Sequence, residues 1–383
     1  MSNRFIIEDF ALFGGLHCET SAVQKVFAYH GFPLSEEMLF GMGGGIGFIY
    51  WYVKQMPAPI VGGRGGGRYF IEDAAHRLGA TLTIHRTTSS KKGHAQLLDT
   101  LANHEPAIIY ADMAYLPYMG VAEDAHFGQH VFVVYGIDEA ANIVYISDRA
   151  KQGVTVKVEA LRQARASKFP PWPPQHAIFE FEYPEQLTIE RNMVLEAMRQ
   201  TVDGMINPPI RNIGLKGIEK WAKLIVKWPE QFPLEKVWNA LYQGFIYIET
   251  GGTGGSAFRP MYARYLQEVT ELFPIPGLDA VITKYHEAGR LWSKIANLLL
   301  PDEYPMLRNA RDIICEQSRI GEEQPPHATT KLQALNRELK LKMKAILAEV
   351  VDAPKFLPII QERILKLHEV ETEAIKHLQA VLK

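Results

Sequence analysis

The hydrophobic pattern of this chain changes near Pro184, and that change limits the fold more than any other feature of the sequence. Before it, short runs rich in Val, Ile, Tyr and Phe alternate with glycine-rich and polar segments, which is typical of mixed strands and helices. After it, apolar residues recur at helical spacing almost to the last residue. The pattern predicts an α+β domain with an antiparallel sheet over residues 1–184 and an all-α domain over residues 185–383.

The first half also carries signals for single elements. The helical pattern of residues 21–29 ends at Gly-Phe-Pro, and Ser-Glu-Glu from residue 35 indicates the start of a second, short helix. Two glycine-rich stretches, 41–47 and 62–67, are expected to be loops, because glycine loses much chain entropy inside regular elements. Strands are expected at 80–85, 107–110, 131–135, 143–146 and 177–183.

Composition argues against several classes of function. A net charge of −2 on 383 residues gives no basic excess for binding nucleic acid or an anionic membrane, and no apolar run is long enough to span a bilayer. The N-terminus carries acidic residues instead of a secretory signal. The two cysteines, Cys18 and Cys315, make no disulfide framework. We therefore expect a reduced, cytoplasmic protein.

Cys18 is the first candidate for chemistry. Gly14 and Gly15 precede it and a helical pattern follows it, so we expect it at a helix N-terminus. Unpaired backbone N–H groups and the positive end of the helix dipole favour a thiolate there. The same groups can stabilise an oxyanion on an acyl group attached to the sulfur. The alternative is a small buried hydrophobic residue, which is the role of most free cysteines.

A nucleophilic cysteine needs a base, and the base needs an orienting group. His130 opens the first of two neighbouring predicted strands, and Asp148 follows the second. A hairpin with a five-residue loop over 138–142 would pair Ile137 with Ile143. That register makes His130 and Asp148 diagonal neighbours on one face of the sheet. The alternative is that Asp148 only starts the turn that follows.

Other patterns are weaker signals. His126 and His130 are four residues apart, which resembles a zinc-binding spacing, but that spacing needs a helix and His130 lies in a predicted strand. The glycine-rich stretches match neither the Walker A pattern nor the dinucleotide-binding fingerprint. We expect them to be mobile loops over a cleft, where Arg64 and Arg68 can hold an anionic group. Solvated surface arginines are the alternative.

A third glycine-rich segment interrupts the helical half at residues 250–256. This loop and Arg259 are the part of the second domain that we expect nearest to the cleft, with Arg259 as a substrate-binding residue. A plain connection between two helices is the alternative.

Long motifs run through the chain: Gly-Gly-Leu-His-Cys-Glu-Thr-Ser-Ala at 14–22, Gly-Met-Gly-Gly-Gly-Ile-Gly-Phe-Ile-Tyr-Trp at 41–51, Ala-Asp-Met-Ala-Tyr-Leu-Pro-Tyr at 111–118 and Gly-Gln-His-Val-Phe-Val-Val-Tyr-Gly-Ile-Asp at 128–138. They resemble the N-terminal domain of the butirosin biosynthesis protein H (BtrH) family. Thr-Gly-Gly-Thr-Gly-Gly-Ser-Ala-Phe-Arg-Pro at 250–260 resembles the helical domain that commonly follows it.

This resemblance implies a papain-like, C39-like cysteine peptidase fold used for acyl transfer in specialised metabolite biosynthesis, followed by an α-helical domain of open role. It implies that Cys18 takes an acyl group from a thioester, that His130 shuttles the proton and that Asp148 orients His130. The donor would be the 4′-phosphopantetheine thioester of an acyl carrier protein or a CoA-type thioester. No further cofactor and no metal are expected.

The acceptor implied by the resemblance is an amine-bearing small molecule. Asp112 is expected to bind that amine, with His17 and Tyr115 as further substrate-binding residues. A cysteine hydrolase would use the same catalytic residues with water as acceptor, and a non-catalytic binding protein on the same fold is the other alternative. A homodimer is compatible with the apolar content of the helical half. Two basic groups are candidates for contact with an acidic carrier protein, Lys91 with Lys92 and Arg162 with Arg165 and Lys168.

Overall fold

A computed structural model describes residues 3–54, 56–122, 124–349 and 355–383; the side chains of Arg68 and of residues 347–349 fall outside this description. The chain divides into two compact units, each made of three segments. The first contains Met1–Glu36, Gly79–Leu187 and Glu316–Leu339, and the second contains Glu37–Leu78, Thr188–Cys315 and Lys340–Lys383. These units are not consecutive stretches of sequence, so the boundary predicted at residue 184 between two consecutive domains stays a prediction.

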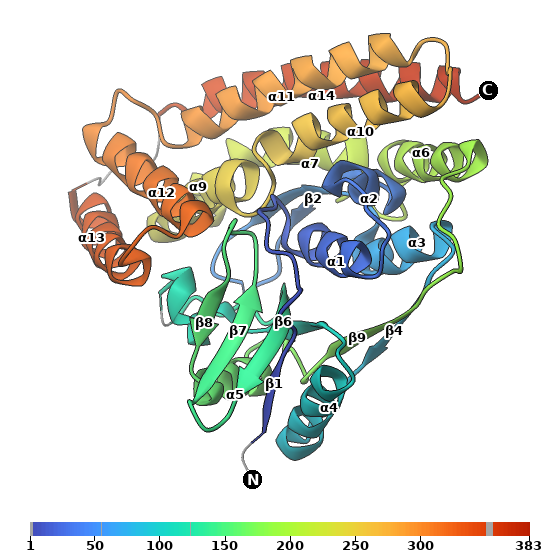
Figure 1. Cartoon of the computed structure of the whole chain (residues 1–383). Coiled ribbons are helices and arrows are strands. Elements are labelled where there is room, and N and C mark those ends of the chain that lie inside the picture. Colours follow the sequence, from blue (N-terminus) through green and yellow to red (C-terminus); the bar gives the residue numbers. More distant parts are fainter. Residues whose placement is uncertain (1–2, 55, 123, 350–354) are drawn as a thin grey trace. The chain divides into compact units, whose positions relative to one another are not determined.

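An antiparallel sheet of seven strands organises the first unit (Figure 1). The strand order is β4–β9–β5–β6–β7–β8, and β1 pairs with β6 beyond the end of β5. All five strands predicted between residues 80 and 183 are present, whereas β1 and β8 are too short to carry an alternating pattern. The strands are β1 (Arg4–Ile6), β4 (Thr81–His85), β5 (Ala107–Ala111), β6 (His130–Asp138), β7 (Ile143–Ser147), β8 (Val154–Val156) and β9 (Ile178–Glu182).

Three helices pack on this sheet. The helix α1 (Cys18–Tyr29) contacts β5 and β6, and it contains the helix predicted from residue 21. The helices α4 (Ser90–Ala102) and α5 (Val158–Ala166) also pack on the sheet and contact each other. Two short 3₁₀ turns, η2 (Met113–Tyr115) and η3 (Pro117–Met119), follow β5. Together these elements confirm the predicted α+β character of the first part of the chain.

The register of the β6–β7 hairpin corrects the prediction at the turn. Asp138 pairs with Ile143, where Ile137 was the predicted partner, so the loop is one residue shorter than expected. A β-bulge in the middle of β6 then shifts the register by one residue, and Val133 pairs with Ser147. The bulge adds one extra residue to β6, which compensates for the loop being one residue shorter than predicted. Beyond the bulge, the strands therefore pair in the predicted register.

The second unit contains a two-stranded antiparallel sheet of β2 (Ile46–Trp51) and β3 (Ile60–Arg64). The prediction that the stretches 41–47 and 62–67 are loops is therefore wrong for residues 46–47 and 62–64, which lie in these strands, and for residues 41–42, which end α2 (Glu36–Met42). A Cβ atom at Gly47 would lie 2.8 Å from the Arg64 carbonyl oxygen, and one at Gly63 would lie 2.5 Å from that of Ala257. These glycines serve a close approach of backbone to backbone instead of chain flexibility.

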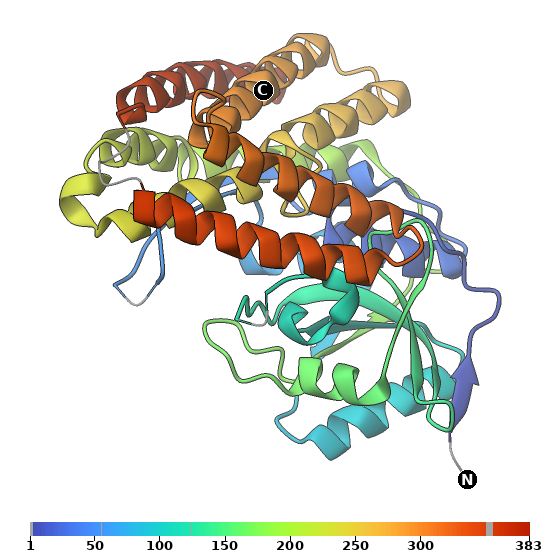
Figure 2. The same ribbon diagram turned by 90° about the vertical axis from the view of Figure 1, so that its left-hand side faces the viewer.

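Helices form the rest of the second unit, and the described residues after β9 contain no further named strand, which agrees with the predicted α-rich second half. The long helices α11 and α14 pack side by side and also contact α10 and α7 respectively (Figures 1 and 2). Phe48, Trp221 and Trp292 stack in the core of this unit, with ring centroids 5.8–5.9 Å apart. The helices are α2 (Glu36–Met42), α3 (Phe70–Arg77), α6 (Arg191–Ile206), α7 (Gly214–Ile225), α8 (Trp228–Gln231), α9 (Leu234–Phe245), α10 (Arg259–Leu272), α11 (Leu278–Leu299) and α14 (Leu357–Val381).

Two more helices, α12 (Pro305–Glu323) and α13 (Ala328–Glu349), have residues in both units. The second unit also holds two short 3₁₀ helices, η1 (Gly67–Tyr69) and η5 (Ser256–Phe258), and a short π-helix, η4 (Ile246–Thr250). In the part of the chain that the structure describes, no helix combines the length and the apolar character needed to cross a membrane.

Candidate active site

Cys18 is the first residue of α1. His17 precedes it as the N-cap, with extended backbone angles of φ −115° and ψ 132°. Because the first four N–H groups of a helix have no acceptor within the helix, the backbone N–H groups of this turn can point at a ligand beside the Cys18 sulfur. Cys18 is a free cysteine and is partly exposed to solvent. The local sequence thus builds the kind of helix N-terminus that the glycine-rich approach predicts.

Glu36 holds the segment that leads into Cys18. Its carboxylate accepts hydrogen bonds from the backbone N–H groups of Leu16 at 2.8 Å and His17 at 2.7 Å, and from the Thr20 hydroxyl at 2.9 Å. Glu36 is buried, and burial raises the pKa of its carboxyl group although these hydrogen bonds oppose the change. Sequence reasoning missed this residue, since it follows Cys18 by a full helix and a turn.

The glycine before this segment is required by packing. A Cβ atom at Gly15 would lie 2.1 Å from the Ser21 hydroxyl oxygen. Its backbone N–H donates a hydrogen bond of 2.9 Å to the carbonyl of Arg149. The approach to Cys18 is therefore joined directly to the residue that follows Asp148.

His130 and Asp148 are in contact. His130 Nε2 lies 2.7 Å from Asp148 Oδ2, and both side chains are buried. The same oxygen accepts a hydrogen bond of 2.9 Å from the Tyr118 hydroxyl, and Oδ1 accepts one of 2.8 Å from the Arg149 backbone N–H. Tyr118 is a second residue that sequence reasoning missed. The carboxylate is thus fixed by three donors, and it fixes the imidazole ring in turn.

The Cys18 side chain lies beside the His130 ring and contributes to the raised pKa of the imidazole. Because Nε2 faces Asp148, Nδ1 is the ring nitrogen that remains for the sulfur. Burial by itself would lower the pKa of His130, but the charge of Asp148 and the contact with Cys18 raise it to about 9. Asp148 shows the complementary change, since burial is outweighed by His130 and the pKa of the carboxyl group falls well below its usual range.

Lys25 supports the same group of residues from within α1. Its side chain is buried, and Nζ donates hydrogen bonds to the backbone carbonyl of Asp148 at 2.7 Å and to the Ser21 hydroxyl. Burial lowers the pKa of Lys25 to about 8, against the opposing charges of Asp148 and Glu36. Lys25 therefore links the helix that carries Cys18 to the strand end that carries Asp148.

Two segments of the chain match known protein families. Residues 17–149, which include Cys18, His130 and Asp148, match the family model described as butirosin biosynthesis protein H, N-terminal. This segment is similar to that family. Residues 159–320 match a domain of unknown function (DUF4872), so the BtrH-type domain and the accompanying domain follow each other as the motifs indicate. A search of the curated proteins finds no match to this chain.

Asp112 of the BtrH-type domain does not face an open site. Its side chain is 0% exposed. Oδ1 accepts hydrogen bonds from the backbone N–H groups of Ala114 at 3.2 Å and Phe127 at 3.1 Å, and Oδ2 contacts Ser167 Oγ at 2.5 Å and His126 Nδ1 at 2.9 Å. This placement does not suit a residue that binds an acceptor amine directly.

His126 and His130 each contact a different carboxylate, Asp112 and Asp148 respectively. The described part of the chain contains no group of three or more His, Cys, Asp or Glu side chains arranged to hold a metal ion. The two histidines therefore belong to two separate histidine–carboxylate pairs.

His17 and Tyr115 are the other predicted substrate-binding residues of this unit. His17 directly precedes Cys18 as the N-cap of α1, and Tyr115 is the last residue of η2. His17 is buried, with Nδ1 3.2 Å from the Thr20 hydroxyl and Nε2 3.8 Å from the Glu19 carboxylate. Tyr115 is partly exposed and its ring lies 5.8 Å from that of His126. Of the two, Tyr115 has the more accessible side chain.

The three predicted arginines belong to the second unit. Arg259 is buried and donates hydrogen bonds to Glu371 Oε1 at 2.6 Å and to the carbonyls of Gly47, Gly63 and Ala257 at 2.7–3.0 Å. It ties the β2–β3 hairpin to α14, so a role in direct substrate binding is not supported. Arg64 packs over the Phe70 ring at 4.4 Å. The side chain of Arg68 lies outside the described residues.

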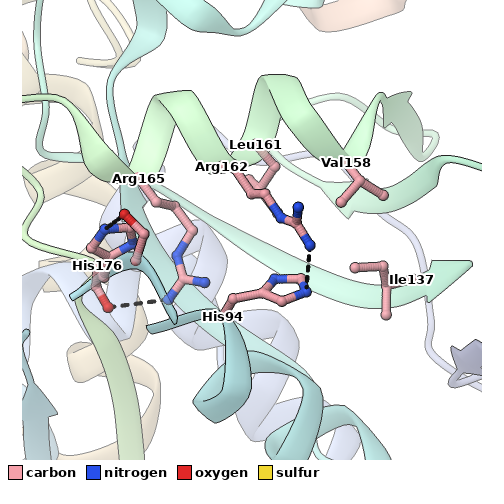
Figure 3. Close-up of a pocket in the computed structure, with 8 residues that line it drawn as sticks. His94, Ile137, Val158, Leu161, Arg162, Arg165 and His176 are labelled. Atoms are coloured by element: carbon pink, nitrogen blue, oxygen red, sulfur yellow. Dashed lines mark hydrogen bonds between the residues drawn. The ribbon is translucent and has the colours of Figure 1, made fainter. Parts of the chain in front are cut away.

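A small pocket lies between α4 and α5 (Figure 3). Arg165 points into this region, is 2% exposed and donates hydrogen bonds of 3.1 Å to the carbonyls of Gly93 and His176. Arg162 contacts the His94 ring at 3.1 Å and Glu139 at 3.4 Å. Arg165 is therefore buried and does not belong to the predicted carrier-binding surface. Arg162 is paired with Glu139. The other members of the two predicted basic groups, Lys91, Lys92 and Lys168, are exposed.

Proposed function

We propose that this chain is an acyltransferase in which Cys18 is the nucleophile, on a fold related to the papain-like and C39-like cysteine peptidases. One observation carries the proposal: the imidazole of His130 contacts the buried carboxylate of Asp148 at 2.7 Å and lies beside the Cys18 side chain. A cysteine, a histidine and a carboxylate in this order of contacts activate sulfur for attack on an acyl carbon.

Two properties of the site support the nucleophilic role. With a pKa of about 9, His130 is a cation at neutral pH and stabilises a neighbouring thiolate. The N-terminus of α1 supplies backbone N–H groups beside the sulfur, where an oxyanion develops when an acyl carbon is attacked. Glu36 keeps this turn in place by binding the N–H groups of Leu16 and His17.

The proposed reaction has two steps. In the first, the Cys18 thiolate attacks the carbonyl carbon of an acyl thioester; the new C–S bond forms, the donor C–S bond breaks and His130 gives its proton to the leaving thiolate. In the second, an amine attacks the acyl group on Cys18; the C–N bond forms, the bond to sulfur breaks and the amine proton returns to His130. Amide formation makes the second step favourable, because a thioester is the less stable acyl group.

The proposed donor is the 4′-phosphopantetheine thioester of an acyl carrier protein or a similar acyl thioester, and the proposed acceptor is an amine-bearing small molecule. The family description, which refers to butirosin biosynthesis, supports a biosynthetic role. Of the two basic groups predicted to contact an acidic carrier, Lys91, Lys92 and Lys168 are exposed and available for that contact.

Intact-protein mass spectrometry tests the proposal. The wild-type protein, Cys18→Ala and Cys315→Ala are each mixed with a panel of acyl-pantetheine thioesters and then with amines. We expect an acyl-sized mass increase on the wild type and on Cys315→Ala, its absence on Cys18→Ala, and discharge by amines. Discharge at the same rate in water alone would indicate a hydrolase. No adduct with any donor would favour a binding protein and contradict the proposal.

A further inference from the structure

A second histidine–carboxylate pair, outside the Cys18 triad, lies in the same unit. His126 Nδ1 is 2.9 Å from Asp112 Oδ2. Asp112 is fully buried, and three further groups from the segments around residues 114, 127 and 167 also contact its carboxylate. A buried carboxylate with this many partners holds the imidazole in one orientation, as Asp148 does for His130.

The ring of His126 is fixed on its faces as well. Phe169 stacks on it with ring centroids 3.4 Å apart and planes 8° apart, and Tyr115 lies 5.8 Å away on a tilted ring. The side chain keeps 16% of its surface exposed. Because Nδ1 contacts Asp112, Nε2 is the nitrogen that remains, and within the described part of the chain it has no hydrogen-bond partner. An oriented ring with an accessible, unpaired nitrogen is equipped to accept a proton.

The topology brings both pairs to one end of the sheet. Asp112 follows the last residue of β5, Asp148 follows the last residue of β7, and His130 begins β6 between them. Ala111 pairs with His130, so the Cα atoms of Asp112 and His130 lie within about 10 Å of each other. Three residues lie between His126 and His130, which limits the distance between their Cα atoms to about 14 Å.

One chain segment also connects the two carboxylates. It starts at Asp112, which binds His126, and reaches Tyr118, whose hydroxyl donates a hydrogen bond to Asp148. The turns η2 and η3 form this segment. The backbone from Asp112 to Tyr118 therefore joins the residue that holds His126 to a residue that holds Asp148.

We propose that His126, oriented by Asp112, is the base that deprotonates the acceptor in the second step of the reaction. The inference rests on the proposed acyl transfer and assigns its acceptor to the class of protonated alkyl amines. An alkylammonium ion must lose two protons on its way to an amide, because it is not a nucleophile until the first has left. His130 can accept only one of them.

His126 Nε2 takes one proton from the ammonium ion, and the neutral amine attacks the acyl carbon on Cys18. The C–N bond forms and the C–S bond breaks. The second proton passes from the nitrogen to His130 Nδ1, which restores the Cys18–His130 ion pair, and protonated His126 releases its proton to water. A water nucleophile needs only the His130 part of this sequence.

The test separates the two half-reactions of wild type, His126→Gln and His94→Gln. His94 is the matched control, because it also contacts a carboxylate, Glu139 at 2.8 Å, and is 18% exposed. Cys18 is loaded with an acyl thioester or, independently of the proposed donor, with p-nitrophenyl acetate. Discharge is then followed by mass spectrometry with an alkyl amine, with hydroxylamine, which is largely unprotonated at neutral pH, and with water.

We expect His126→Gln to form the acyl adduct as wild type does and to lose about 100-fold or more in discharge by the alkyl amine. Discharge by hydroxylamine and by water should stay near wild type, and His94→Gln should match wild type throughout. Equal losses with all three acceptors, or no loss with the alkyl amine, would overturn the inference. Loading by p-nitrophenyl acetate but by no thioester would count against the proposed donor, while leaving the test of His126 intact.

A second variant protects the test against misfolding. Asp112→Asn keeps the size of the side chain and weakens its hold on His126, so the same selective loss with the alkyl amine is expected from it. Thermal unfolding of each variant is measured beside the kinetics. A selective loss in either variant at unchanged stability supports the inference, and a loss that tracks unfolding in both variants contradicts it.

Discussion

The ammonium group of Lys25 donates a hydrogen bond of 2.7 Å to the backbone carbonyl of Asp148. Lys25 lies on α1, two helical turns after Cys18, and Asp148 follows the last residue of β7, the strand beside the one that His130 begins. This single contact connects the element that carries the nucleophile with the element that orients the base. It also puts a buried charge into the first unit, and the pH dependence of that charge can be measured.

Lys25→Met is expected to change how stability depends on pH. The pKa of Lys25 is lowered from 10.5 to about 8. Between these values the unfolded chain binds more protons than the folded one, so this group makes wild type more stable as pH rises through the window. We expect the stability difference, wild type minus Lys25→Met, to grow by about 2 kcal/mol between about pH 7.5 and about pH 9.5.

Urea unfolding at the two pH values measures this difference, and His130 cancels because both proteins contain it. Lys91→Met, which removes an exposed lysine of the same unit, is the control for the loss of a lysine side chain as such. A Lys25→Met difference that is independent of pH would mean that Lys25 is not held as a buried cation.

Asp148→Asn is expected to lower the pKa of His130. The folded-state value of about 9 lies above the ordinary value of 6.5, because the charge of Asp148 outweighs the cost of burial. Protonated His130 therefore stabilises the wild type fully below about pH 6.5, and this contribution is lost as pH rises through about 9. The substitution should move the loss to lower pH and reduce acylation of Cys18 by about 100-fold or more.

NMR titration of the His130 ring measures the shift directly, and the rate of acyl-adduct formation gives the activity. Asp138→Asn, which removes a carboxylate paired with the exposed Arg4, serves as the control. If the His130 titration stays in place in Asp148→Asn, the carboxylate is not the cause of the raised pKa.

Glu36→Gln is expected to destabilise the first unit by about 1–3 kcal/mol, because an amide cannot accept from all three donors that face the carboxylate. The turn before Cys18 should loosen, and the rate of Cys18 alkylation should fall with it. Denaturant unfolding and iodoacetamide labelling measure the two effects.

Glu37→Gln provides the control for that variant. Glu37 is the next residue, and it pairs with the half-exposed Arg264 at 2.7 Å, a contact worth at most about 1 kcal/mol. It should leave the alkylation rate of Cys18 unchanged. Equal effects of the two substitutions would argue against a specific role of Glu36.

Gly63→Ala is expected to destabilise the second unit by about 1–3 kcal/mol, because its Cβ would lie 2.5 Å from the Ala257 carbonyl oxygen. Gly204→Ala is the matched control in α6, where nothing lies within 4 Å of the added atom. That variant should gain about 0.5–1 kcal/mol from helix propensity. Thermal unfolding of both variants decides the matter, and a tolerated Gly63→Ala would contradict the close approach of the two backbones.

Much of the fold follows from neighbours along the chain. The helix after Gly14–Gly15, the strands between residues 80 and 183 and the helices of the second half all have the period that their element imposes, so local pattern was sufficient to predict them. The glycines of β2 and β3 were wrongly predicted to form loops. In sequence, a glycine that allows flexibility cannot be told from a glycine that allows close packing of two backbones. Only the backbone opposite Gly47 and Gly63 distinguishes the two.

The sequence by itself determined which chemistry to look for, because a cysteine at a helix N-terminus and a histidine and an aspartate on adjoining strands are set by local pattern. Tertiary structure alone decided what supports them. Lys25 and Asp148 are 123 residues apart, Glu36 follows Leu16 by 20, and Asp112 binds His126 instead of facing substrate. Such partners are chosen by which buried polar groups meet when the chain packs, because each must find a hydrogen bond once water is excluded.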